Sequence, residues 1–145
     1  MQHLGSERLT RRLIDALHVE AMLLADETRA YFDDTGRNER DGLPPVGRVA
    51  FACESLKITT RLMHIIAWLI AHRSDGALER MPKPLGTAPE TDARSLAAMP
   101  ATARLLIESS IDLYERLRRL DENLRQLEPP PSPALDLIDR LQRAF

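Results

Sequence analysis

The chain has 145 residues, 29% of them charged, and a formal net charge of −2. This length is enough for one domain with a buried core, and the small net charge excludes a strong field for nucleic acid or an anionic membrane. The longest apolar run, residues 65–71, is too short to span a bilayer. We therefore expect a cytoplasmic protein without a signal peptide, and neither nucleic acid nor membrane as a partner.

The first expected helix covers residues 6–32, with Ser6 as its N-cap. Residues 33–44 form a polar turn, in which Gly36 ends this helix and the prolines at 44 and 45 begin the next one. Such a short connection predicts antiparallel neighbours. The apolar stripe of the first helix contains Leu9, Leu13, Ile14, Leu17, Ala21, Leu24, Thr28 and Tyr31.

The second helix, residues 45–73, carries two apolar lines. Their alternating steps of three and four predict that the helix packs lengthwise on other helices. Two covered faces require a third helix or another copy of the chain, so we predict a homodimer, with Ile58, Leu62, Ile65 and Leu69 at its interface. The first line is Val46, Val49, Cys53, Leu56, Thr60, Met63, Ala67 and Ile70, and the second is Ile58, Leu62, Ile65, Ile66 and Leu69.

The third side of this helix is polar except for one tryptophan. One interpretation is a half-buried structural network whose members pair with one another. The other is a partner-binding surface anchored by Trp68, because Trp and Arg are frequent at interface hot spots. This polar stripe consists of Glu54, Lys57, Arg61, His64, Trp68 and His72.

Residues 74–99 form a long connection interrupted by prolines at 82, 84 and 89. Connections of this length are usually mobile or functional, although a bundle can also return the chain this way without a function. A short helix is expected within 90–99, with Thr91 or Asp92 as its cap. Pro100 then begins the third long helix, whose apolar seam is Ala103, Leu106, Ser110, Leu113, Leu117, Leu120, Leu124 and Leu127. The charged residues that follow Tyr114, including Asp121, form its outer face.

Three prolines, 129–131, end the third helix. They divide the chain into a bundle domain, residues 1–128, and an amphipathic tail, residues 129–145. Ile138, Leu141 and Phe145 line one face of the tail helix. So short a helix is marginal alone, and it must dock on its own bundle, on a second copy or on another protein.

We find no catalytic constellation in the sequence. His64 and His72 lie about 12 Å apart along the helix axis, too far to share one metal without ligands from elsewhere. Cys53 has no neighbouring base, and the glycines form no phosphate-binding loop. We expect no catalytic residue, no cofactor, no metal site and no enzymatic activity. The predicted fold is an all-α antiparallel three-helix bundle with a short C-terminal helix.

Several segments carry a family resemblance. These are AYFDDTGR near residue 30, ESLxxTTRLM followed by AWL and HR in the central helix, and LIESSIDLYERLRRLDENL in the third. In this order they resemble the RcdA family (regulator of CtrA degradation), over roughly residues 20–75 and 99–125. RcdA-like proteins are small helical bundles, usually dimeric, that act as adaptors for the ClpXP protease in alphaproteobacteria.

The resemblance implies a non-enzymatic adaptor that promotes regulated proteolysis of cell-cycle regulators. Its partners would be the protease and unfoldase complex and protein cargo or response regulators. The alternative is a structural or signalling bundle that binds a response regulator or another protein without a proteolytic role. A degradation assay separates the two, because only an adaptor accelerates cargo turnover.

Overall fold

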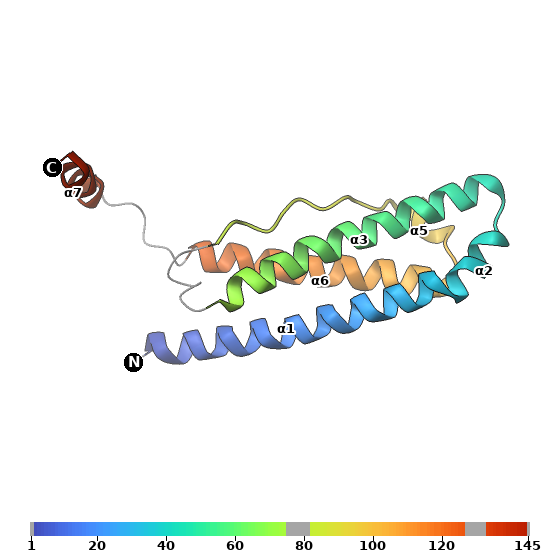
Figure 1. Cartoon of the computed structure of the whole chain (residues 1–145), viewed down its shortest axis with the longest axis horizontal. Coiled ribbons are helices and arrows are strands. Elements are labelled where there is room, and N and C mark those ends of the chain that lie inside the picture. Colours follow the sequence, from blue (N-terminus) through green and yellow to red (C-terminus); the bar gives the residue numbers. More distant parts are fainter. Residues whose placement is uncertain (1, 75–81, 127–132, 145) are drawn as a thin grey trace.

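The computed structural model describes residues 2–74, 82–126 and 133–144. Its three long helices are α1 (Gln2–Asp33), α3 (Pro45–Arg73) and α6 (Ala101–Gln126), and they form an antiparallel bundle (Figure 1). Three shorter helices are α2 (Thr35–Asp41), α5 (Ala93–Ala97) and α7 (Pro133–Ala144). The described residues contain no strand, and the predicted all-α bundle with a short C-terminal helix is confirmed.

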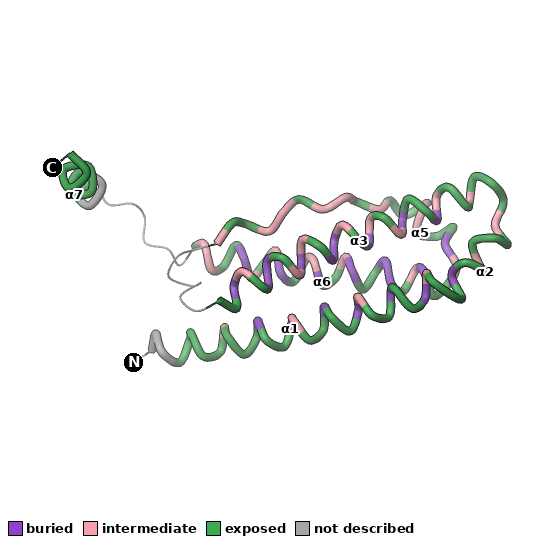
Figure 2. The backbone as a smooth tube through the Cα atoms, viewed as in Figure 1, coloured by how far each residue is buried: buried purple, intermediate pink, exposed green. Residues whose placement is uncertain are grey.

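The core lies where the three long helices face one another (Figure 2). Fully burying one large aliphatic side chain contributes about 1.5–3 kcal/mol, so this apolar interior is the main stabilising element. It contains Ile14, Leu17, Ala21, Leu24 and Tyr31 of α1, Phe51, Ile58, Leu62, Ile65, Trp68 and Leu69 of α3, and Ala103, Leu106, Ile107, Leu113 and Leu117 of α6.

The predicted stripe of α1 is largely correct. Its members from Ile14 to Tyr31 are buried, whereas Leu9 and Leu13 remain 68% and 46% exposed. The predicted polar turn after α1 is wrong, because most of it forms α2. Gly36 permits this arrangement: a Cβ there would lie 2.7 Å from the carbonyl oxygen of Tyr31. The absence of a side chain therefore lets α2 fold back closely on the end of α1.

On α3, the first of the two predicted apolar lines, from Val46 to Ile70, lies mostly on the exposed side of the helix. Val49, Leu56 and Met63 are 65%, 67% and 66% exposed, while Ile58 and Ile65 of the second line are 0% exposed. When a helix is apolar on most sides, the spacing of its apolar residues does not show which side faces the core. The prediction that Ile58, Leu62, Ile65 and Leu69 form a dimer interface is also wrong, because this chain itself buries them in its core.

An extended segment, residues 82–92, leads into α5 and is the described part of the connection from α3. We call it the strap, and it runs along α3 and α6 (Figure 1, yellow-green). Asp92 caps α5, its Oδ1 accepting a hydrogen bond of 2.7 Å from the Ser95 N–H. The expected short helix with Asp92 as its cap is thereby confirmed. The expected mobile connection also included residues 75–81, which lie outside the described residues.

The seam of α6 follows the prediction closely. Its members from Ala103 to Leu117 are buried, and Leu120 and Leu124 are half-buried. Leu127 and Phe145 lie outside the described residues. Helix α7 lies apart from the three long helices in Figure 1, with Ile138 48% and Leu141 50% exposed. The division into a bundle and a tail stays a prediction, and none of the described helices is long and apolar enough to cross a membrane.

Candidate functional site

The polar stripe of α3 faces α6 and the strap. Glu54, Arg61, Trp68 and His72 are buried, and Lys57 and His64 are half-buried. The chain therefore covers the stripe predicted as a partner-binding surface, which forms a polar network in this structure. Its members fall into two clusters, one around Arg61 and one around Trp68.

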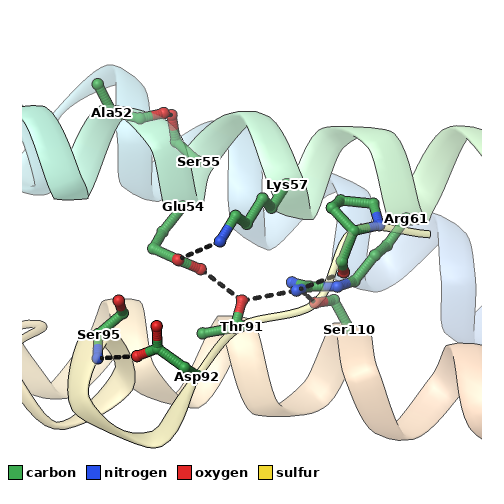
Figure 3. Close-up of polar contacts among 10 residues, drawn as sticks. Ala52, Glu54, Ser55, Lys57, Arg61, Thr91, Asp92, Ser95 and Ser110 are labelled. Carbon is green, nitrogen blue, oxygen red and sulfur yellow. Dashed lines mark hydrogen bonds and ion pairs between the residues drawn. The ribbon is translucent and has the colours of Figure 1, made fainter.

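Arg61 is the centre of the first cluster (Figure 3). Its side chain is only 1% exposed, and it joins α3 to both α6 and the strap. Nη1 donates to Ser110 Oγ at 3.3 Å, while Nη2 donates to the Pro89 carbonyl at 3.1 Å and to Thr91 Oγ1 at 2.7 Å. Burying an unpaired charge is very costly, so these acceptors are what allow a guanidinium in this interior.

Glu54 supplies the negative charge of the same cluster. Its Oε2 accepts from the Thr91 hydroxyl at 2.6 Å, and its Oε1 pairs with Lys57 Nζ at 3.0 Å. Burial lowers the pKa of Arg61, and the attraction of the Glu54 carboxylate acts in the opposite direction. Thr91 thus links a buried cation to a buried anion, and its hydroxyl comes from the strap (Figure 3).

The second cluster is organised by Asp121 of α6. Its Oδ1 accepts from Trp68 Nε1 at 3.0 Å and from Arg125 Nε at 3.2 Å, and its Oδ2 accepts from the Leu85 N–H at 3.1 Å. Arg125 Nη2 also donates to the Pro82 carbonyl at 2.7 Å. Asp121 is buried, whereas the sequence interpretation placed it on the charged outer face. The available signal was its position four residues after Leu117, on the apolar stripe.

His72 completes this cluster. It stacks on Trp68 with ring centroids 3.7 Å apart, and its Nδ1 lies 2.8 Å from the Trp68 carbonyl oxygen. Because a carbonyl only accepts, Nδ1 carries the proton. Burial is the main cause that lowers the pKa of His72, although the Trp68 carbonyl and Asp121 act against it. Among the described residues, its buried Nε2 has no hydrogen-bond partner.

His64 lies beside Gly86 of the strap. A Cβ added to Gly86 would lie 2.4 Å from His64 Nδ1, so the strap approaches the ring only because this residue is glycine. The Gly86 carbonyl accepts a hydrogen bond of 2.7 Å from the Tyr114 hydroxyl. The sequence interpretation did not identify Gly86, Tyr114 or Thr91 as parts of this site, since side-chain bonds to a main chain leave no periodic pattern.

A second candidate surface is apolar. The outer face of α3, defined by Val49, Leu56, Met63 and Ile70, is exposed along the helix. Beside it, α1 and α3 enclose a groove of about 600 Å³, whose apolar lining includes Phe32. Within the described residues, no three His, Cys, Asp or Glu side chains lie close enough together to hold a metal ion. Both surfaces offer contacts for a macromolecule.

These features define a small helical-bundle protein with a strapped polar groove and one bare apolar face. The chain belongs to the family described as "Protein of unknown function (DUF1465)", whose model matches residues 5–145. It is similar to RcdA from Caulobacter crescentus CB15: identity is 32%, the TM-score is 0.61, and the match covers 83% of this chain and 97% of that one. The resemblance to the RcdA family is therefore confirmed. No curated protein matches the chain.

Proposed function

We propose that the protein is a non-enzymatic adaptor that brings protein cargo to the ClpXP protease. The observation that carries this proposal is the likeness to RcdA over 97% of the length of that chain. Adaptors of this kind need binding surfaces and no reacting groups. The outer face of α3 supports the proposal, because large exposed apolar patches commonly mark interaction sites.

An adaptor acts by raising the local concentration of its cargo. Binding two partners at once converts a second encounter into an intramolecular one, so turnover increases without new chemistry. This mechanism requires two separate surfaces on one small domain. The outer face of α3 and the strapped groove lie on different sides of that helix, because the strap side faces α6 while Leu56 and Met63 face solvent.

A reconstituted degradation assay tests the proposal. Purified ClpXP and a cell-cycle regulator are incubated with and without the protein, and the half-life of the regulator is measured. The expected result is faster turnover, which Met63→Glu on the outer face abolishes. A matched control is Arg119→Glu on α6, another exposed position changed to glutamate. Turnover that does not depend on the protein would contradict the adaptor role.

The alternative function is a signalling bundle that binds a response regulator or another protein without proteolysis. The apolar groove between α1 and α3 suits this role equally, since it would accept a partner of either kind. If the protein binds the regulator but leaves its half-life in the assay unchanged, this alternative is favoured.

A further inference from the structure

The strap is held mainly through its own main chain. Side chains of α3 and α6 bind four of its backbone groups, spread from one end of the strap to the other. The four hydrogen bonds join Arg125 Nη2 to the Pro82 carbonyl (2.7 Å), the Leu85 N–H to Asp121 Oδ2 (3.1 Å), the Tyr114 hydroxyl to the Gly86 carbonyl (2.7 Å) and Arg61 Nη2 to the Pro89 carbonyl (3.1 Å).

Recognition of a main chain does not depend on which residues the bound segment carries. Extended peptides are often bound this way, with main-chain hydrogen bonds giving affinity and side-chain pockets giving specificity. Two positions of the strap carry specificity here. Leu85 packs against the core, and Gly86 leaves no room for a Cβ beside His64. The groove therefore favours an apolar residue followed by glycine.

The floor of this groove is polar and buried. Arg61, Trp68 and Asp121 are 1%, 3% and 6% exposed, and each directs a donor or acceptor towards the strap or towards a group that binds it. Leaving such groups buried without partners is costly. With the strap in place these groups are paired. Once the strap leaves, water or another extended main chain must take over its hydrogen bonds.

The strap itself contributes little apolar burial. None of residues 82–92 is fully buried, and Lys83, Pro84, Thr87 and Glu90 are exposed. Segments with few buried apolar contacts open locally at a lower free energy than the core around them. The strap can therefore leave the groove while the three long helices stay packed.

We propose that the groove between α3 and α6 binds an extended peptide segment of a partner protein, and that the strap occupies it as an internal substitute ligand. The favoured segment has an apolar residue followed by glycine, placed against Asp121 and Tyr114. Release of the strap would uncover the polar stripe that the sequence suggested as a partner surface. The biological use of this peptide site rests on the proposed adaptor role. Peptide binding is measured without any protease, so failure of the peptide site and failure of the adaptor role can be told apart.

The test uses the full chain and its single tryptophan. Trp68 is 3% exposed and shares its acceptor, Asp121, with the Leu85 N–H of the strap, so we use its quenching by acrylamide to report whether the strap is in place. Gly86→Ala places a Cβ against the His64 ring and should displace the strap, raising the quenching constant several-fold while the helical circular dichroism is kept. A synthetic peptide of residues 82–92, added in trans, should then bind and restore the protection of Trp68.

The peptide is added above about 1 mM, because any tethered strap still competes at an effective concentration of that order. The matched protein control is Gly42→Ala, where an added Cβ meets only ordinary contacts at 3.5 and 3.7 Å and quenching should stay unchanged. The matched peptide control carries the Gly86→Ala change and should not bind.

If the Gly86→Ala protein loses helix, the pair of substitutions Tyr114→Phe and Arg125→Gln loosens the strap without adding volume. Unchanged quenching in these variants, or an opened groove that ignores the natural peptide, would overturn the proposal.

Discussion

At the scale of single residues, Arg61 shows how a charge is kept inside a small bundle. Its guanidinium reaches α6 through Ser110 and the strap through Pro89 and Thr91, so one side chain joins three segments. The hydrogen bonds of Arg61 therefore hold the end of the strap at Pro89 and Thr91 and also join α3 to α6.

Replacing Arg61 by alanine should destabilise the fold by about 2–4 kcal/mol, because it leaves a cavity and unpaired buried acceptors. Urea denaturation followed by circular dichroism measures this change. Arg119→Ala is the control, since Arg119 is exposed and should change stability by less than about 0.5 kcal/mol. Equal effects of the two substitutions would show that the network around Arg61 contributes nothing specific.

His72 gives the fold a dependence on pH. The folded state lowers the pKa of His72, mainly through burial, so the unfolded chain binds more protons at acidic pH. The contribution of His72 to the free energy of unfolding should be fully present above its unfolded pKa of about 6.5 and should be lost as the pH falls below that value. Melting temperatures between about pH 5 and 8 measure this slope. His72→Phe, which keeps the stack on Trp68, should flatten the curve, and parallel curves for the two proteins would contradict the assignment.

At the scale of elements, α2 depends on one glycine. Gly36 is buried, and a Cβ there would meet the Tyr31 carbonyl oxygen at 2.7 Å. Gly36→Ala should cost about 1–3 kcal/mol, in the range of an overpacked core. Gly42, at the C-cap of α2, has φ of −77°, and a Cβ there would meet only ordinary contacts, so Gly42→Ala should stabilise by about 0.4–1 kcal/mol. Thermal unfolding compares the two, and a Gly36→Ala protein as stable as the parent would show that α2 moves freely.

The sequence predicts some elements better than others, and the reason is physical. The sequence predicts the stripes of α1 and α6 correctly over most of their length, because each helix carries a single long apolar line at helical spacing. On α3 apolar residues occur on two sides, so Leu56 and Ile58 were equally good core candidates until the other helices decided between them. The strap was not predictable as a cover, since the bonds to Pro82 and Gly86 use carbonyl groups that every residue carries.

At the scale of the whole molecule, the apolar face left on α3 requires an explanation. A helix that is apolar on most sides is normally covered on most sides, and here one side is bare. Val49, Leu56, Met63 and Ile70 are 65%, 67%, 66% and 57% exposed, and they follow one another along the helix. The adjoining groove between α1 and α3 extends this apolar surface with Ile66 and Phe32.

A second copy of the chain is the simplest cover, because a two-fold interface brings the same face of each α3 together. We therefore predict that, in the absence of a bound partner, the outer face of α3 forms a homodimer, in place of the core residues predicted from the sequence. A protein partner that binds this face would then have to displace the second copy. Sedimentation at micromolar concentration should show a dimer, and Leu56→Glu should give a folded monomer, because the substitution buries a charge at the centre of the interface. The Arg119→Glu protein, changed at an exposed position of α6, should remain dimeric. If the parent protein sediments only as a monomer, the homodimer is contradicted and this face is left to a different partner. In that case Leu56→Glu should abolish binding of that partner while the sedimenting mass stays unchanged.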